Sequence, residues 1–247
     1  MFSAWGRQHW WPAQSRFEVI VGAYLTQNTS WSNVEKAMRS LRQARVLNLA
    51  AIREIPLARL EKLIRSAGYF RQKAQRLKAF VKFLDERHGG SLARMFAQPT
   101  ARLREELLAL NGIGPETADS ILLYAGNHPV FVVDAYTRRI LERHAIIGSK
   151  ATYDEIRTLC ESALAGAASS VNLCLPRGSS FSPAPNQTFP KGTRHRPSRM
   201  SLARRTVVTQ VYNEMHGLIV GVGKNHCLKS QMRCEGCPLQ KFLPGKT

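Results

Sequence analysis

Apolar residues recur at helical spacing through the first half of the chain. A period of three to four residues marks three stretches there: FEVIVGAYLTQNTSW, VEKAMRSLRQARVL and LARLEKLIRSAG. A fourth stretch, FRQKAQRLKAFVKFLDERHGG, has the same period and ends in a pair of glycines, which is typical of a helix C-terminus. Strand signals are nearly absent. The pattern predicts successive helices from about Phe17 to His88.

The second half continues in the same style, with one exception. TARLREELLAL, TADSILLYAG and VYNEMHGLIVGVGKNHC carry helical stripes, whereas PVFVVDAYTRRILERHA indicates a short extended segment followed by a helix. The sequence therefore predicts an all-α protein. Residues 167–210 differ, because they contain much Ser, Pro, Gly and Arg and no acidic residue. We expect them to form a disordered basic insertion within a helical domain.

The net charge of the chain indicates which class of partner it binds. The chain has 247 residues, of which 44% are hydrophobic, enough for a real core. It carries 36 Lys and Arg against 17 Asp and Glu, a net charge of +19. Such an excess repels itself unless a polyanion shares the surface, which favours nucleic acid over an anionic lipid surface or a merely soluble basic protein. No apolar run is long enough to span a membrane and no signal peptide is evident, so we expect a cytoplasmic protein.

A tight bend lies in LNGIGPETADSILLYA, between two predicted helices. Gly112 and Gly114 allow the backbone to turn sharply and to approach a ligand closely, and Pro115 suits the first position of a helix. Backbone amides at such a bend and at the start of the next helix suit a phosphate oxygen. Alone, a Gly-x-Gly between helices is more often a plain turn. VVDAYTRRIL, about twenty residues downstream, makes the pattern far more specific.

The five cysteines suggest a metal rather than disulfides. Three of them stand close together in CLKSQMRCEGC, where Cys227, Cys234 and Cys237 have C-x6-C-x2-C spacing. In a reducing compartment, thiols at this spacing converge on an iron-sulfur cluster or a zinc ion. Three buried free cysteines are the less favoured reading.

These motifs together resemble the helix-hairpin-helix DNA glycosylase superfamily, and within it an endonuclease III relative. LNGIGPETADSIL is similar to the hairpin, VVDAYTRRIL to the segment with the catalytic aspartate, GAYLTQNTSW to the helix with a DNA-inserting Gln, and CLKSQMRCEGC to the terminal iron-sulfur motif. The resemblance covers most of the chain outside residues 167–210. It implies two all-α lobes: a helical barrel of residues 17–128 that includes the hairpin, and a second lobe of residues 1–16 and 129–247, with DNA between them.

The resemblance also implies a catalytic residue, Asp134. A carboxylate at a helix start stays ionised and can stabilise the positive sugar formed when an N-glycosidic bond breaks, or activate a water. An ordinary N-cap is the alternative, and the two roles are compatible. Bifunctional relatives carry a lysine where this chain has Glu116, so no amine stands there to form a Schiff base. This pattern resembles the monofunctional 3-methyladenine glycosylase branch.

DNA contacts are expected from two further places. The hairpin residues that match the family are Leu110, Gly112, Ile113, Gly114 and Thr117. Gln27 aligns with the residue that fills the gap left by an extruded base, although a polar cluster after an apolar stripe can equally be a helix end. The aromatic side chains that could stack on a flipped base, if they are not core residues, are Trp10, Trp11, Trp31, Tyr69 and Phe70.

The same resemblance implies a [4Fe-4S] cluster held by Cys227, Cys234 and Cys237. The family's fourth cysteine is missing, and Leu243 occupies its position. The residues that could substitute are Cys160, Cys174 and His226. Zinc and an empty site are the alternatives.

We therefore expect a monomeric base-excision repair enzyme that binds double-stranded DNA and hydrolyses the N-glycosidic bond of a damaged, alkylated base without cutting the strand. One rival is an endonuclease III-like glycosylase with lyase activity through another amine. Another is a non-catalytic helix-hairpin-helix DNA-binding protein, against which the retention of Asp134 argues.

Overall fold

A computed structural model describes residues 1–171 and 195–245 of the chain, and the side chains of residues 1–166 and 195–245. Its contacts divide the chain into two compact units. We call Ala13–His128 the hairpin unit, and Met1–Pro12 together with Pro129–Thr247 the cysteine unit.

The described part of the chain is helical throughout, which confirms the all-α prediction. Within it there is no β-strand, only one isolated antiparallel bridge between Cys227 and Met232. None of its helices is long and apolar enough to cross a lipid bilayer.

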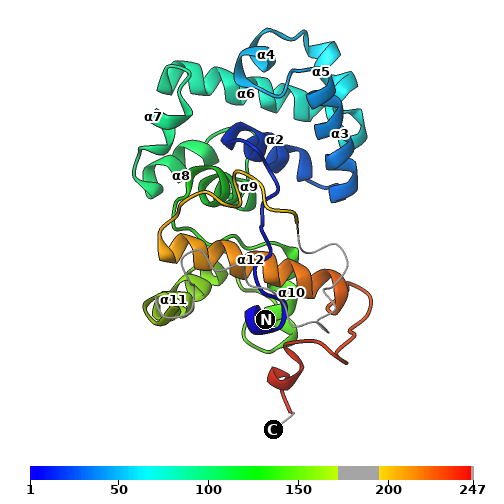
Figure 1. Cartoon of the computed structure of the whole chain (residues 1–247), viewed down its shortest axis with the longest axis vertical. Helices are drawn as coiled ribbons and strands as arrows, with labels where there is room; N and C mark the ends of the chain where they lie inside the picture. Colours follow the sequence, from blue (N-terminus) through cyan, green and yellow to red (C-terminus); the bar gives the residue numbers. More distant parts are fainter. Residues whose placement is uncertain (172–194, 246–247) are drawn as a thin grey trace. The chain divides into compact units, whose positions relative to one another are not determined.

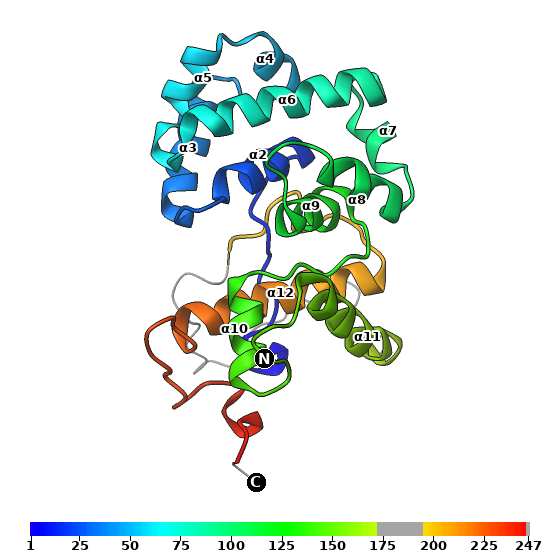
Figure 2. The same cartoon turned by 180° about the vertical axis from the view of Figure 1, so that it is seen from behind.

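The hairpin unit is built around α2 (Figure 1), which is buried along most of its length. Its helices are α2 (Arg16–Thr26), α3 (Trp31–Gln43), α4 (Leu49–Glu54), α5 (Leu57–Leu63), η1 (Arg65–Ala67), α6 (Phe70–His88), α7 (Leu92–Phe96), α8 (Thr100–Leu108), α9 (Pro115–Ser120) and η2 (Ile121–Gly126). Ser15 caps α2 by accepting a hydrogen bond from the Glu18 amide. The long helix α6 packs against α2, α4 and α5, and η2 packs against α2 (Figure 2).

Lys73 of α6 fixes the point where α2 ends. Its Nζ donates hydrogen bonds to the carbonyl oxygens of Leu25 and Ala67, at 2.8 Å and 2.7 Å. The Leu25 carbonyl belongs to the last turn of α2, where carbonyls lack helical partners. The side chain is 1% exposed, and this burial lowers the pKa of Lys73 to about 8. The two carbonyls thus bind the buried amine of Lys73. These hydrogen bonds also fix the position of the segment after α2.

The cysteine unit is organised around α12, which is buried along most of its length. Its helices are α1 (Phe2–Trp5), α10 (Ala135–Arg143), α11 (Tyr153–Val171), α12 (Val207–Asn225) and η3 (Gln240–Phe242). Helices α1, α10 and α11 all pack against α12 (Figure 2). The approach to α10, residues 130–133, is buried and not helical.

Two glycines of α12 permit close packing. A Cβ on Gly223 would collide with the Tyr136 ring of α10, and a Cβ on Gly217 would lie 3.1 Å from the Cβ of Trp10. Because side chains are absent at these two positions, α10 and the N-terminal segment both reach the backbone of α12. Trp10 and Trp11 are each 7% exposed and form part of this core.

The expected insertion is shorter than residues 167–210. Helix α11 continues to Val171 and α12 begins at Val207, so both ends of that range are helical. Thr206 caps α12 by accepting a hydrogen bond from the Thr209 amide. This cap explains why a helix begins here, although the polar composition of the region did not predict one.

Residues 195–206 pack on the N-terminal segment of the same unit. The His195 amide donates to the Gln8 carbonyl at 3.1 Å, and Ser198 Oγ donates to the Trp11 carbonyl at 3.3 Å. Met200 is buried. This part of the expected insertion is therefore ordered, and residues 172–194, including Cys174, lie outside the described residues.

The close contact at Gly223 yields a stability prediction. Gly223→Ala should lower the free energy of unfolding by about 2 kcal/mol, because the added methyl group overpacks the interface between α10 and α12. Gly166→Ala is the matched control, since an added Cβ on α11 meets nothing within 4 Å and alanine favours a helix. Denaturant unfolding followed by circular dichroism measures both. Equal stability of the two variants would contradict the packing described here.

Candidate functional site

The bend predicted from the two glycines is a hairpin between α8 and α9. Gly112 has a φ of +78°, in the left-handed region that favours glycine, and the Ile113 amide donates to the Leu110 carbonyl at 3.1 Å. Pro115 is the first residue of α9, as expected. The helix continues without a break into the π-helical residues of η2. The first amides of this helix carry a positive partial charge that suits a phosphate oxygen.

The hairpin residues differ in what they present to solvent. Ile113 is 6% exposed and anchors the hairpin in the core, whereas Gly114 is exposed. Leu110 is half-buried. A Cβ on Gly114 would meet nothing within 4 Å. The backbone at Gly114 is therefore the part of the hairpin that a large anion can approach most closely.

Gln27 is bound to the hairpin. It follows the last residue of α2, and its Nε2 donates to the Gly112 carbonyl at 2.9 Å and to Thr117 Oγ1 at 3.0 Å. Arg76 of α6 donates to the other end of the same amide, Oε1, at 2.9 Å. Three residues predicted separately from the sequence, Gln27, Gly112 and Thr117, therefore lie together.

Arg76 was not predicted from the sequence. Its side chain lies so close to Gly112 that any Cβ there would collide with it. Arg76 thus holds the Gln27 amide in one orientation and places a positive charge beside the hairpin. One arginine within a basic amphipathic helix carries no signal that could have singled it out.

Asp134 begins α10 and caps it. Its Oδ1 accepts hydrogen bonds from the Thr137 amide at 2.7 Å and from Thr137 Oγ1 at 2.9 Å. Its other oxygen, Oδ2, lies 3.5 Å from Nε2 of His216 on α12. Both side chains are largely buried, with exposed fractions of 11% and 6%. The N-cap interpretation is correct, and it leaves one carboxylate oxygen facing a histidine.

The surroundings of Asp134 favour its ionised form over the protonated form. Burial opposes ionisation, but His216 and the hydrogen bonds from Thr137 outweigh it and hold the pKa of Asp134 below its ordinary value. Burial, with Asp134 nearby, raises the pKa of the adjacent Tyr136. At neutral pH the site therefore presents a negative charge.

His216 is a functional candidate that sequence reasoning missed. It lies 82 positions from Asp134 in the sequence, within an apolar stretch of α12 where a histidine is more often an ordinary core residue. Aromatic rings of Phe131 and Trp10 surround it, with centroids at 6.4 Å and 6.3 Å. His216 lies beside the Asp134 carboxylate only because α10 packs on α12.

The aromatic candidates separate into two groups. Trp10 and Trp11 are core residues of the cysteine unit, which is the alternative that the sequence left open for them. Tyr69 is 67% exposed, and Trp31 donates from Nε1 to Glu35 at 3.0 Å on the surface of α3. Phe70 begins α6 beside the guanidinium of Arg71, which lies 5.7 Å from its ring centroid.

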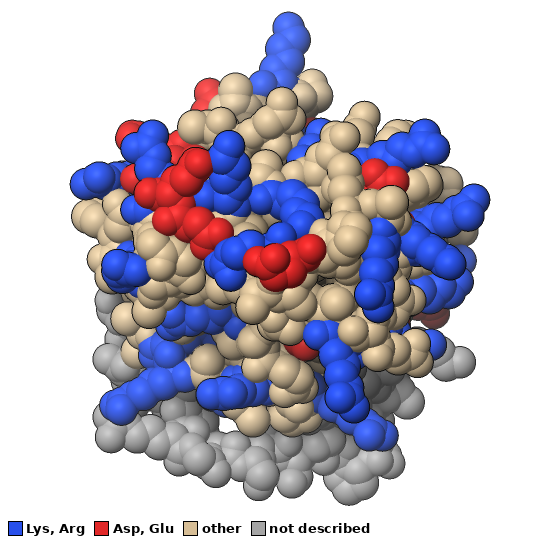
Figure 3. Space-filling view, turned by 90° about the horizontal axis from the view of Figure 1, so that it is seen from above, with Lys and Arg blue, Asp and Glu red and all other residues tan. Residues whose placement is uncertain are grey.

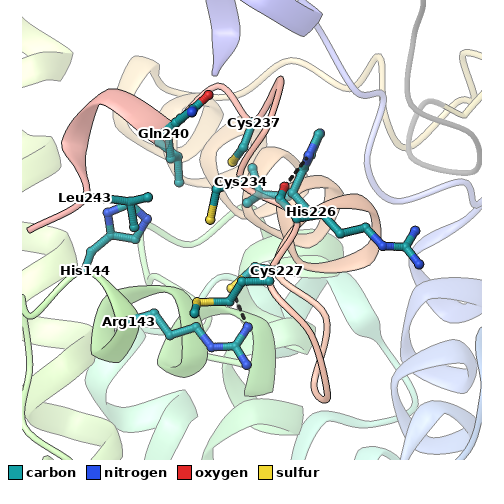
Figure 4. Close-up of a pocket in the computed structure, with 12 residues that line it drawn as sticks. Arg143, His144, His226, Cys227, Cys234, Cys237, Gln240 and Leu243 are labelled. Atoms are coloured by element: carbon teal, nitrogen blue, oxygen red, sulfur yellow. Dashed lines mark hydrogen bonds between the residues drawn. The ribbon is translucent and has the colours of Figure 1, made fainter. Parts of the chain in front are cut away.

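The three clustered cysteines line one pocket (Figure 4). Leu243, His144 and His226 also line this pocket. Arg143 donates to the sulfur of Cys227 at 3.1 Å and to the Leu228 carbonyl at 2.7 Å. Within residues 1–166 and 195–245, no three His, Cys, Asp or Glu side chains are grouped around a point that could hold a single metal ion.

Positive charge is spread over the molecule. Figure 3 shows Lys and Arg side chains over much of one face, with Asp and Glu in a few groups. The hairpin unit has 18 Lys and Arg against 10 Asp and Glu, and the cysteine unit has 18 against 7. Both units therefore carry an excess that attracts a polyanion.

Comparison with known proteins decides the family. Residues 21–165, which include the hairpin and Asp134, match the family described as HhH-GPD superfamily base excision DNA repair protein. The chain belongs to the HhH-GPD superfamily. The expected membership of the helix-hairpin-helix glycosylases is thus confirmed.

Relatives of this HhH-GPD protein are DNA glycosylases of the endonuclease III type. A protein of Methanocaldococcus jannaschii named as a DNA repair glycosylase is 39% identical over 98% of this chain and 91% of its own. The crystal structure of H. pylori 3-methyladenine DNA glycosylase bound to 1,N6-ethenoadenine has a TM-score of 0.68 and 28% identity, and covers 88% of each chain. A trapped endonuclease III–DNA covalent intermediate shares the fold, with a TM-score of 0.63, 18% identity and coverage of 95% and 85%.

The two hairpin glycines should respond differently to substitution. Gly114→Val should weaken binding to duplex DNA several-fold while leaving the thermal midpoint nearly unchanged, because its side chain would project from the hairpin into open space. Gly112→Val should weaken DNA binding and also lower the thermal midpoint. The valine clashes with Arg76, and a β-branched residue is forced to adopt a positive φ. Binding titrations at low salt and thermal denaturation separate the effects. A wild-type dissociation constant for Gly114→Val would show that the hairpin is a turn that does not contact DNA.

Proposed function

We propose that this HhH-GPD protein is a monofunctional glycosylase that removes an alkylated base from double-stranded DNA. The observation that carries the proposal is the geometry of Asp134, a largely buried carboxylate that caps α10 and faces His216. Such a group is suited to a reaction that develops positive charge on a sugar.

The chemistry assigned to Asp134 is hydrolysis. The bond between C1′ and the base nitrogen breaks, and the bonding electron pair leaves with the base. A water oxygen joins C1′, and one proton of that water stays on the new hydroxyl. A positively charged base leaves as a neutral molecule and the second proton goes to solvent, whereas a neutral base takes up that proton as it leaves. The carboxylate stabilises the positive sugar and can orient the water, while His216 and Thr137 keep its charge in place.

At the two positions considered among the described residues, 116 and 73, no amine is placed to reach the sugar, which supports hydrolysis without strand cleavage. Glu116 is exposed in the first turn of α9, at the position where bifunctional relatives carry lysine. Lys73 has the lowered pKa that a nucleophilic amine needs, but it is buried between the carbonyls of Leu25 and Ala67. Its amine cannot reach a sugar while those bonds persist.

Similarity to a 3-methyladenine glycosylase supports an alkylated base as substrate. Alkylation of a ring nitrogen gives the purine a positive charge, which makes it a better leaving group. An enzyme that supplies a carboxylate and no Schiff base is sufficient for such a base. The proposed partner is double-stranded DNA, bound by a monomer.

In this proposal the hairpin holds the DNA backbone and Gln27 fills the gap left by the extruded base. The backbone amides at Gly114 and at the start of α9 donate hydrogen bonds to a phosphate whatever the DNA sequence. Gln27 must first exchange its bonds to the hairpin and Arg76 for bonds to DNA. Hydrogen bonds to the orphaned base compensate for those lost, so the exchange costs little.

We also propose that Cys227, Cys234 and Cys237 hold a [4Fe-4S] cluster. The soft thiol donors and their C-x6-C-x2-C spacing suit such a cluster, and Arg143 supplies a positive donor to one sulfur. When bound, the cluster cross-links residues 227–237 and so shapes this basic loop. It takes no part in the glycosidic chemistry assigned to Asp134.

Base release and strand cleavage, measured separately, test the proposal. Duplex DNA methylated with dimethyl sulfate, and an oligonucleotide containing 1,N6-ethenoadenine, serve as substrates. Wild-type protein should release free base from at least one of them and leave abasic sites that break only after alkali. Asp134→Asn should lower the single-turnover rate by more than about 100-fold with unchanged DNA affinity, because the charge is lost but the cap remains.

Asp154→Asn, at an exposed position in the first turn of α11, is the control and should release base at the wild-type rate. Trapping of wild-type protein on DNA by borohydride would instead show a Schiff base and favour the bifunctional rival. Tight DNA binding without release from any substrate would favour the non-catalytic rival.

A further inference from the structure

We propose that His144 is the fourth ligand of the cluster. This inference rests on the cluster part of the proposed function and is independent of the glycosylase reaction. The family motif would place a fourth cysteine at position 243, where this chain has Leu243. Three thiolates leave one corner of a four-iron cluster without a protein ligand.

His144 lies beside the position of the missing cysteine. It directly follows α10, and its Nδ1 lies 3.0 Å from the carbonyl oxygen of Phe242, the residue before Leu243. Figure 4 shows the imidazole ring and Leu243 together on one side of the pocket, with Cys234 and Cys237 on the other. A ligand lost from position 243 can therefore be replaced by His144 at the same corner.

The hydrogen bond to Phe242 selects a tautomer that can bind metal. A carbonyl oxygen only accepts, so Nδ1 must carry the proton that it donates. In the neutral ring the lone pair then stands on Nε2. Histidines that bind metal usually donate their other N–H to a carbonyl or carboxylate in this way, which fixes the ring and strengthens the ligand.

The competing side chains are engaged elsewhere. The ring of His226 stacks on Trp5, with centroids 5.9 Å apart, and its Nδ1 pairs with the Arg233 carbonyl at 3.1 Å. In Figure 4 this ring is turned away from the thiols. Cys160 is on α11 and does not line the pocket, and burial raises the pKa of its thiol to about 11. Cys174 lies outside the described residues.

Iron content and the visible spectrum test the assignment without any activity assay. The full chain is purified anaerobically after expression with iron, and iron, sulfide and zinc are measured per chain. Wild-type protein should be brown with four irons, as the proposed cluster requires. His144→Ala should retain less than about a tenth of that iron, since loss of a ligand costs at least as much metal affinity as loss of a group that orients one.

Two further variants keep the test decisive. His226→Ala, at the other histidine of the same pocket, should keep the wild-type iron and colour. The double variant His144→Ala with Leu243→Cys should regain both, because it rebuilds a four-thiolate set at the same corner. Circular dichroism on each variant separates loss of the cluster from loss of the fold, and recovery in the double variant excludes general misfolding.

Three outcomes overturn the inference. His144→Ala could retain full iron and an unchanged spectrum, or His226→Ala could be the variant that loses iron. Wild-type protein could also bind zinc or no metal at all. In the last case the base-release assay, run on the same preparation, shows whether the glycosylase proposal stands without the cluster.

Discussion

Asp134 can remain a carboxylate in a largely buried position because His216 reaches it from α12 while Thr137 binds it from within α10. Removing a charge from water is costly, and partners on both sides offset that cost. The contact requires α10 to lie close against α12. Gly223 permits this approach, because its missing side chain leaves room for the Tyr136 ring. The chemistry proposed for Asp134 therefore depends on the packing of the cysteine unit.

In the hairpin unit, a neutral side-chain amide is likewise held by partners on both sides. Lys73 ends α2 at a fixed point, and the next turn carries Gln27 to the hairpin. Arg76 and Thr117 then hold the two ends of its amide. The polar groups that the proposed function brings to DNA are thus ordered before it arrives. Such preorganisation lowers the entropy lost on binding, and each bond given up is replaced by one to DNA.

Local pattern predicted the parts of the structure that depend on neighbouring residues. The length of α6, the bend at Gly112 and the cap at Asp134 follow from periodicity, glycine geometry and N-cap chemistry, and the structure has all three. The polar region before α12 misled the prediction, because Ser, Pro and Arg in residues 195–206 resemble a disordered segment although part of it packs on the N-terminal segment.

Residues that act across the chain could not be predicted in this way. His216 meets Asp134, Arg76 meets Gln27 and His144 meets the Phe242 carbonyl only because helices distant in sequence pack together. A histidine or arginine on an amphipathic helix looks the same whether it faces solvent, core or a reactive group. Family resemblance carries motif residues from one protein to another. It does not reveal a residue such as His144, which lies beside the position of the missing cysteine although it is distant in sequence.

The pH dependence of base release in His216→Gln protein tests the central claim most directly. Release requires ionised Asp134, so the single-turnover rate should fall as the pH drops through the pKa of this group. In wild-type protein the lowered pKa places that fall below the ordinary range of an aspartate. Without His216, burial should raise the pKa and move the fall to higher pH. Asp134→Asn, after subtraction of uncatalysed acid hydrolysis, should show no such fall. An acid limb at the same pH in wild-type and His216→Gln protein would contradict the account.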